Sequence, residues 1–113
     1  MYEADSLLIE ALGDSPKMRI IDFFMENLLN DFTKREVIKG TGMSTKTFYK
    51  YFSDIEEAEI VKPTRKIGRA QLYTLNKENK IVKNLMEMEK ELSERSRKKQ
   101  AEEMERKKVK ATA

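Results

Sequence analysis

Apolar residues recur at helical spacing in the first part of the chain, and this pattern predicts two helices there. A short apolar run over residues 6–12 ends at Gly13. The second helix begins at Ser15 and Pro16, because serine caps helices and proline fits the first turn, and it continues to about Leu29. Its apolar stripe consists of Met18, Ile21, Phe24, Met25 and Leu28.

Two further helices are predicted on either side of a turn that contains two glycines. Thr33, followed three residues later by Glu36, matches the capping box and opens the first helix, which ends at residues 40–42. Ser44 caps the second helix. Its apolar face is expected to be buried and carries Phe48, Phe52 and Ile55. The side chains on or beside its opposite face are Thr45, Lys46, Thr47, Tyr49 and Lys50.

The pattern then changes to that of a β-hairpin. Residues 60–64 are rich in β-branched side chains and contain a proline that suits only an edge strand. Residues 65–69 form the predicted tip, where Gly68 can adopt a positive φ angle. Residues 70–75 alternate between apolar and polar and form the returning strand.

The last predicted helix starts near Lys77, after a cap at Asn76. It carries a narrow, heptad-like apolar seam of Ile81, Leu85, Met88 and Leu92. This seam is too short for a freestanding coiled coil, but it is long enough to pair with its twin beside a folded body. Residues 94–113 have no apolar face, so we expect a charged tail that is frayed or disordered.

The order of these elements is that of a winged helix-turn-helix. We therefore predict a mainly α fold with a small β-hairpin and a long C-terminal dimerisation helix. The predicted parts are a short N-terminal helix (1–13), the winged-helix DNA-binding domain (14–76), the dimerisation helix (77–93) and the charged tail (94–113).

The composition removes most enzymatic chemistry. The 113 residues include no cysteine and no histidine, which excludes thiolate metal sites, disulfides and the commonest general base. Carboxylate or lysine catalysis would need a pocket, for which a chain of this size has little room, and no set of carboxylates has the spacing of a metal-binding loop. We therefore expect no enzyme, no metal site and no cofactor.

Location is predicted from hydropathy and from the first residues. No apolar run approaches the ~20 residues that cross a bilayer. The first residues are acidic, which is the wrong sign for a secretory signal. We expect a cytoplasmic protein without a membrane partner.

Charge is segregated along the chain. The net charge is +3, yet residues 1–14 hold four acidic residues and no basic one, whereas residues 64–80 hold five basic residues and one acidic residue. Such segregation favours a polyanion such as double-stranded DNA as the partner. A solvated surface of mixed charge is the alternative.

The helix-turn-helix order assigns roles to exposed side chains. The short turn lets residues 33–39 brace the helix that begins at Ser44, so that the start of this helix can enter a major groove. The candidate DNA-binding residues there are Ser44, Thr45, Lys46, Thr47, Tyr49 and Lys50. Arg65, Lys66 and Arg69 at the hairpin tip would lie along the backbone or in the minor groove.

Four segments together carry a family resemblance: SPKMRIIDFF (15–24), TGMS (41–44), TFYK (47–50) and VKPTRKIGRAQLY (61–73). They resemble archaeal winged-helix transcriptional regulators related to the MarR and ArsR groups. The resemblance covers roughly residues 14–92, and its most specific part is the wing segment. It implies a dimeric DNA-binding protein whose C-terminal helix pairs the subunits.

One position departs from the pattern of that family. Four residues before Gly42, such motifs usually place a small residue, often alanine, where the two helices touch, and this chain has Ile38. Either the helices lie further apart, or Gly40 accommodates the contact.

The resulting prediction is a homodimeric double-stranded-DNA-binding protein that acts as a transcriptional regulator. The alternative is a plasmid or virus DNA segregation, centromere-binding or DNA-organising protein of the same fold, whose charged tail (94–113) would bind a protein partner. A winged helix used only for protein contacts would carry an acidic or apolar third helix and wing, and these are basic here.

Overall fold

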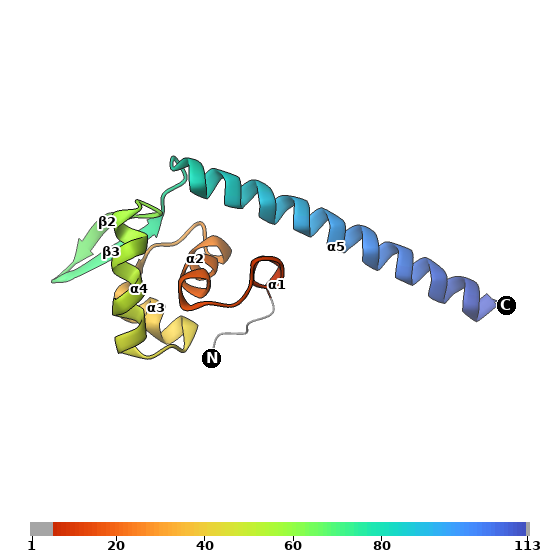
Figure 1. Cartoon of the computed structure of the whole chain (residues 1–113), viewed down its shortest axis with the longest axis horizontal. Helices are drawn as coiled ribbons and strands as arrows, with labels where there is room; N and C mark the ends of the chain where they lie inside the picture. The colour runs from red at the N-terminus through yellow and green to blue at the C-terminus, as the bar shows by residue number, and fades with distance from the viewer. Residues whose placement is uncertain (1–5, 113) are drawn as a thin grey trace.

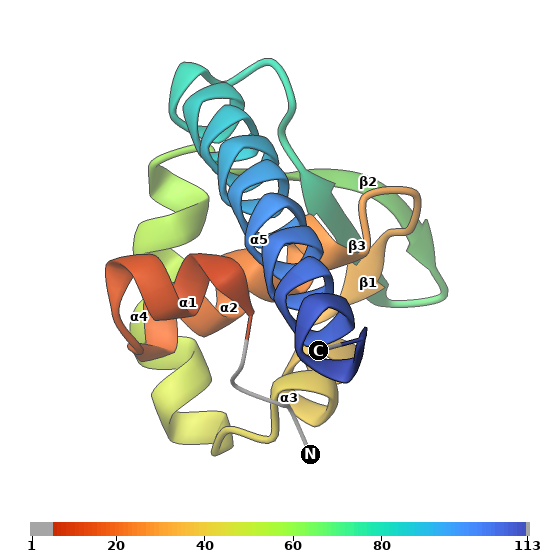
Figure 2. The same cartoon turned by 90° about the vertical axis from the view of Figure 1, so that its right-hand side faces the viewer.

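The computed structural model describes residues 6–112 and has the predicted mainly α architecture with a small sheet (Figure 1). Its elements are α1 (Leu7–Leu12), α2 (Pro16–Glu26), β1 (Phe32–Thr33), α3 (Lys34–Thr41), α4 (Thr45–Glu57), β2 (Val61–Ile67), β3 (Ala70–Leu75) and α5 (Lys80–Thr112). In Figure 2, α4 and the sheet lie on opposite sides of α2, and α5 runs toward the viewer. The molecule measures 64 × 29 × 24 Å, because α5 extends well beyond the body.

The first four helices begin at polar caps, of which Ser15, Thr33 and Ser44 were predicted from the sequence and Ser6 was not. The hydroxyl groups of Ser6, Ser15, Thr33 and Ser44 each accept a hydrogen bond of 3.1 Å from the backbone N–H three residues later. The carboxylate of Glu36 accepts a hydrogen bond from the backbone N–H of Thr33 at 2.9 Å, which completes the capping box. These local bonds satisfy N–H groups that a helix start leaves without partners.

The second helix is shorter than predicted. It ends at Glu26, and Leu29, the predicted last residue of the helix, is 94% exposed. The side chain of Asn27 donates a hydrogen bond to the carbonyl of Phe23 at 2.7 Å, and its backbone N–H donates to Phe24. Asn27 therefore donates hydrogen bonds to two carbonyls of the last helical turn, and the helix ends there.

The core forms where the predicted apolar faces meet. Phe48, Phe52 and Ile55 of α4 are buried, as predicted. The same core includes Leu8, Ile20, Ile21, Phe24, Met25, Val37, Ile60, Val61, Tyr73, Leu75 and Val82. Leu8 and Ile9 of α1 are thus buried within their own chain.

The predicted hairpin is present, but β2 continues to Ile67, so the turn consists of residues 68–69 instead of the predicted 65–69. A third strand joins the sheet. Strands β2 and β3 pair antiparallel around a turn in which Gly68 has a φ of 62°. The sheet order is β1-β3-β2, with Phe32 opposite Tyr73. The sequence did not predict β1, because a strand of two residues leaves no alternation to detect.

Gly40 makes a close contact between α3 and α2, which is a different contact from the one between α3 and α4 that Ile38 affects. A Cβ atom at residue 40 would lie 2.3 Å from a ring carbon of Phe23, so only glycine allows α3 to approach α2 this closely. The Phe23 ring is itself packed edge-on against Phe24 and Phe32, with centroid separations of 5.9 and 4.9 Å. A glycine–phenylalanine contact therefore holds α3, the first helix of the helix-turn-helix, against α2.

We expect Gly40→Ala to lower the free energy of unfolding by about 1–2 kcal/mol in urea denaturation. Overpacking against the Phe23 ring costs about 1–3 kcal/mol, and the better helix propensity of alanine returns up to about 1 kcal/mol. In a Phe23→Leu background the same change should become neutral or stabilising. Lys39→Ala, an exposed change on the same helix, is the control and should stay within about 0.5 kcal/mol. If Gly40→Ala lowered the free energy of unfolding equally in both backgrounds, the contact with Phe23 would not be its cause.

The last helix starts three residues later than predicted. The side chain of Asn76 accepts a hydrogen bond from the backbone N–H of Glu78 at 3.3 Å, which holds a turn rather than a helix. The side chain of Asn79 accepts from the N–H of Ile81 at 2.8 Å and donates to the carbonyl of Ala58 at 2.9 Å. Asn79 therefore stands at the start of α5 and ties it to the end of α4.

The predicted frayed or disordered tail is helical in the structure, since α5 continues to Thr112. Residues 80–112 contain neither glycine nor proline. Glu91 and Arg95 form an ion pair of 2.9 Å one helical turn apart. Glutamates also precede basic residues by four positions at 94/98, 102/106 and 103/107, the orientation that supports isolated helices. The apolar pattern alone does not reveal this helix, because its local support comes from pairs of opposite charge.

Candidate nucleic-acid interface

Helix α4 presents the predicted polar face at the surface. Thr45, Lys46, Tyr49 and Lys50 are exposed, whereas the opposite face of α4 is buried and α4 packs on α2. The hydroxyl of Ser44 donates to the hydroxyl of Thr47 at 2.8 Å, so both belong to the cap of the helix. The side chains at this end whose polar groups project outward are therefore chiefly those of Thr45 and Lys46.

The wing places its three predicted basic residues in two different settings. Lys66 and Arg69 are exposed beside the turn at Gly68. Arg65 lies further back along β2, where its guanidinium binds the carboxylate of Asp31 through hydrogen bonds of 2.9 and 3.1 Å. The three residues look equivalent in the sequence, because nothing local indicates that Arg65 has a partner 34 positions away.

A hollow of about 340 Å³ lies between the start of α3, the middle of α4 and the wing. Its lining residues are Thr33, Lys34, Arg35, Tyr49, Arg69, Ala70, Gln71 and Tyr73. Three of them are basic: Lys34 and Arg35 come from α3, and Arg69 comes from the turn between β2 and β3. The hollow therefore presents positive charge between the helix and the wing, and it suits an anionic ligand.

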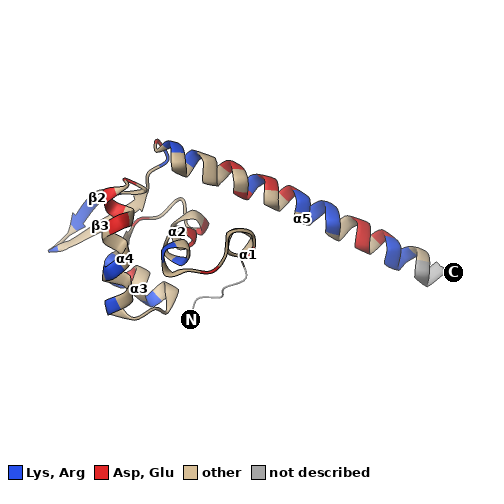
Figure 3. Cartoon of the chain, in the orientation of Figure 1, with Lys and Arg blue, Asp and Glu red and all other residues tan. Residues whose placement is uncertain are grey.

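Lys34 and Arg35 were not among the predicted binding residues. Residues 33–39 are predicted from the sequence only to brace the next helix. The Lys34 ammonium lies 5.5 Å from the ring centre of Tyr49, 5.4 Å from that of Phe52 and 5.8 Å from that of Tyr73. These cation–π contacts hold Lys34 against α4 and the sheet. Figure 3 shows basic segments on α3, α4 and β2, at the end of the molecule remote from the last turns of α5.

The predicted seam of α5 is divided between the body and the surface. Ile81 and Met88 are 53% and 38% exposed, whereas Leu85 and Leu92 are half-buried. Leu85 packs against the core beside the fully buried Val82. The exposed part of the seam therefore consists mainly of Ile81 and Met88.

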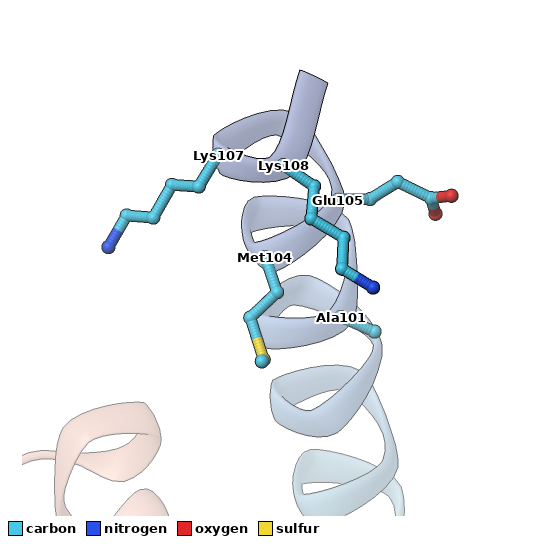
Figure 4. Close-up of a pocket in the computed structure, with 5 residues that line it drawn as sticks. All are labelled: Ala101, Met104, Glu105, Lys107 and Lys108. Carbon is cyan, nitrogen blue, oxygen red and sulfur yellow. The ribbon is translucent and has the colours of Figure 1, made fainter. Parts of the chain in front are cut away.

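A second set of side chains forms a shallow hollow near the end of α5 (Figure 4). Ala101, Met104, Glu105, Lys107 and Lys108 line it, and all five belong to the same helix.

Among residues 6–112 no cluster of acidic side chains could hold a metal ion. Within the same residues no helix is both long and apolar enough to span a membrane.

Known structures of the same fold include transcription regulators. A MepR point mutant from a multidrug-resistant Staphylococcus aureus clinical isolate is 14% identical, with a TM-score of 0.63 over 96% of this chain and 80% of that chain. A different S. aureus MepR mutant, bound to an oligodeoxyribonucleotide, is 13% identical, with a TM-score of 0.64 over the same shares. NadR in complex with 4-hydroxyphenylacetate is 18% identical, with a TM-score of 0.59 over 91% and 71%.

The comparisons establish the architecture of the chain. No protein-family model and no curated protein matches its sequence. At identities of 13–18%, the structural similarity shows a shared fold. The chain has the winged helix-turn-helix fold of these regulators, with a long C-terminal helix.

Proposed function

We propose that the chain is a cytoplasmic transcriptional regulator that binds double-stranded DNA. The start of α4 enters the major groove, and the wing follows the backbone or the minor groove. The observation that carries this proposal is the basic hollow, because it joins Tyr49 of α4 to Arg69 of the wing through Lys34 and Arg35. A DNA strand that runs from one groove to the next would place its phosphates there.

The structural neighbours support the same function. One of them, a MepR mutant, is bound to an oligodeoxyribonucleotide. MepR is described as the transcription regulator of a multidrug efflux pump. Because the candidate DNA-binding residues of this chain lie on the helix-turn-helix and wing of that fold, we assign them the same kind of ligand.

A salt titration of DNA binding tests the proposal. We expect the logarithm of the binding constant to fall linearly with the logarithm of salt concentration. The double variant Lys66→Ala with Arg69→Ala should flatten this slope by up to about two units, because each lost phosphate contact removes ~0.9. Fluorescence anisotropy with a labelled duplex measures both slopes. Lys98→Ala with Lys99→Ala on α5 removes the same charge away from the wing and is the control. Identical slopes for parent and wing variant would remove the wing from the interface.

We further propose that two copies pair through α5. A single recognition helix covers only a few base pairs, so specific binding requires two half-sites about one helical turn apart. Ile81 and Met88 leave exposed apolar surface on the part of α5 next to the body, where a second copy can cover it.

A second candidate is a DNA segregation or DNA-organising protein of the same fold. The observation that favours it is the 33-residue helix α5, which continues well past the body and is highly charged in its outer half. Such a helix can bind a protein partner through residues 94–112. Footprinting separates the two functions, because a regulator protects a short site, whereas an organising protein protects a growing stretch as its concentration rises.

A further inference from the structure

One carboxylate from outside the hairpin holds the base of the wing. Asp31, in the loop between α2 and β1, accepts hydrogen bonds from Nε and Nη2 of Arg65 at 2.9 and 3.1 Å. It also accepts a hydrogen bond from the hydroxyl of Thr64 at 2.6 Å. Thr64 and Arg65 lie 33 and 34 positions after Asp31 in the sequence. The contact therefore joins β2, at one edge of the sheet, to the loop that leads into β1, at the other edge.

A β-bulge makes this contact possible. The pairing of β2 with β3 shifts between Pro63 and Lys66, so that Thr64 and Arg65 together oppose one residue of β3. In a regular strand, neighbouring side chains point to opposite faces of the sheet. A bulge redirects side chains, and here both Thr64 and Arg65 reach the carboxylate of Asp31.

The contact is charge-assisted, and it is present at neutral pH. The hydrogen bonds from Arg65 and Thr64 lower the pKa of Asp31 to about 2, so its carboxylate stays charged. Two parallel N–H donors on one carboxylate fix the geometry as well as the distance. The hydroxyl of Thr74 on β3 donates to the carbonyl of Asn30 at 3.2 Å, so the same loop holds both strands of the wing.

We propose that Asp31 is a positioning residue for DNA binding, which fixes the orientation of the wing relative to α4 through Thr64 and Arg65. The inference rests on the proposed function and deepens it. It assigns Arg65 to the support of the wing and leaves Lys66 and Arg69 as the DNA contacts. A wing that is held in place before binding loses less freedom when DNA binds, so affinity is higher.

Asp31→Asn gives opposite results under the two possible roles of Arg65. If Arg65 contacts DNA, the variant removes a negative charge near a polyanion and releases Arg65, so binding should tighten and the salt slope should steepen by ~0.9. If Asp31 positions the wing, we expect DNA binding to weaken about three- to tenfold with no steeper slope. Tighter binding or a steeper slope would overturn the inference.

Three further variants make the test specific. Thr64→Val keeps the shape of the side chain, removes one hydrogen bond and should weaken binding in the same direction. Asp31→Asn with Arg65→Gln should bind no more weakly than the worse single variant, because both break one contact. Glu91→Gln removes a carboxylate that pairs with an arginine on α5 and should bind like the parent.

Hydrogen exchange adds a readout that does not involve DNA. Wing amides of β2 and β3 should exchange faster in Asp31→Asn, while the amides of α2 and α4 stay as protected as in the parent. Unchanged wing exchange would overturn the positioning role. A parent chain that binds no DNA would overturn the proposed function, whereas a parent and an Asp31→Asn variant that bind equally well would overturn only this inference.

Discussion

Asp22→Asn is expected to raise the free energy of unfolding at pH 8 by up to about 4 kcal/mol and to have little effect near pH 4. Asp22 lies in α2, is 1% exposed, and its Oδ2 atom has no hydrogen-bond partner among the described residues. Burial, together with the nearby charges of Glu26 and Glu89, raises the pKa of Asp22 from 3.8 to about 7. Glu89 belongs to α5, so part of the destabilisation by charged Asp22 arises where the long helix meets the body.

The direction of the pH dependence follows from proton binding. Between pH 4 and 7 the folded chain holds a proton on Asp22 that the unfolded chain has released. The free energy of unfolding therefore falls as the pH rises through this range, and it stays low above pH 7. Since one pKa unit corresponds to about 1.4 kcal/mol, the shift of Asp22 amounts to about 4 kcal/mol at most. Asparagine keeps the shape of the side chain and removes the titration.

Urea denaturation at several pH values measures the effect. Parent and Asp22→Asn should agree near pH 4 and separate toward pH 8. Asp14→Asn is a matched control of opposite sign, because the hydrogen bond from Arg19 lowers the pKa of Asp14. That substitution should remove stability at neutral pH instead of adding it. Parallel curves for the parent and Asp22→Asn would show that Asp22 does not carry the pH dependence.

Local signals made much of the fold predictable. The caps at Thr33 and Ser44, the positive φ of Gly68 and the buried face of α4 depend on residues within one or two turns of each other. Such relations appear in the sequence at fixed spacing. The same reasoning failed at the end of α2, where the side chain of Asn27 competes for backbone carbonyls and ends the helix early.

Long-range relations could not be predicted in the same way. The tie between Asp31 and Arg65 needs a bulge in β2 and a loop that meets it, and no spacing in the sequence indicates either. Asp22 lies one helical turn after Met18 and three residues before Met25, on the buried face of α2, yet a polar residue in an apolar stripe does not reveal what covers it. The candidate interface was therefore predicted in its exposed face but not in its supporting contacts.

The largest effect on assembly is expected from Ile81→Glu combined with Met88→Glu, which should give a folded monomer. Ile81 and Met88 are 53% and 38% exposed, so covering each with a second copy contributes roughly 1 kcal/mol before ordering costs. Glutamates at these positions would add the cost of burying charge. Sedimentation velocity should show the monomer, and circular dichroism should show unchanged helix content. We choose Ile81 and Met88 because they are exposed, whereas a charge at Leu85 would also damage the core.

The same variant connects assembly to DNA binding. Two linked recognition helices gain a high effective concentration at the second half-site, so a monomer should bind a palindromic duplex roughly a hundredfold more weakly. Its binding to a single half-site should change little, because the face of α4 and the wing are untouched. Leu29→Glu with Met104→Glu alters two exposed apolar residues outside the seam and should leave the dimer intact. If this control became monomeric, or if the seam variant remained a dimer, the subunits would pair through another part of the chain.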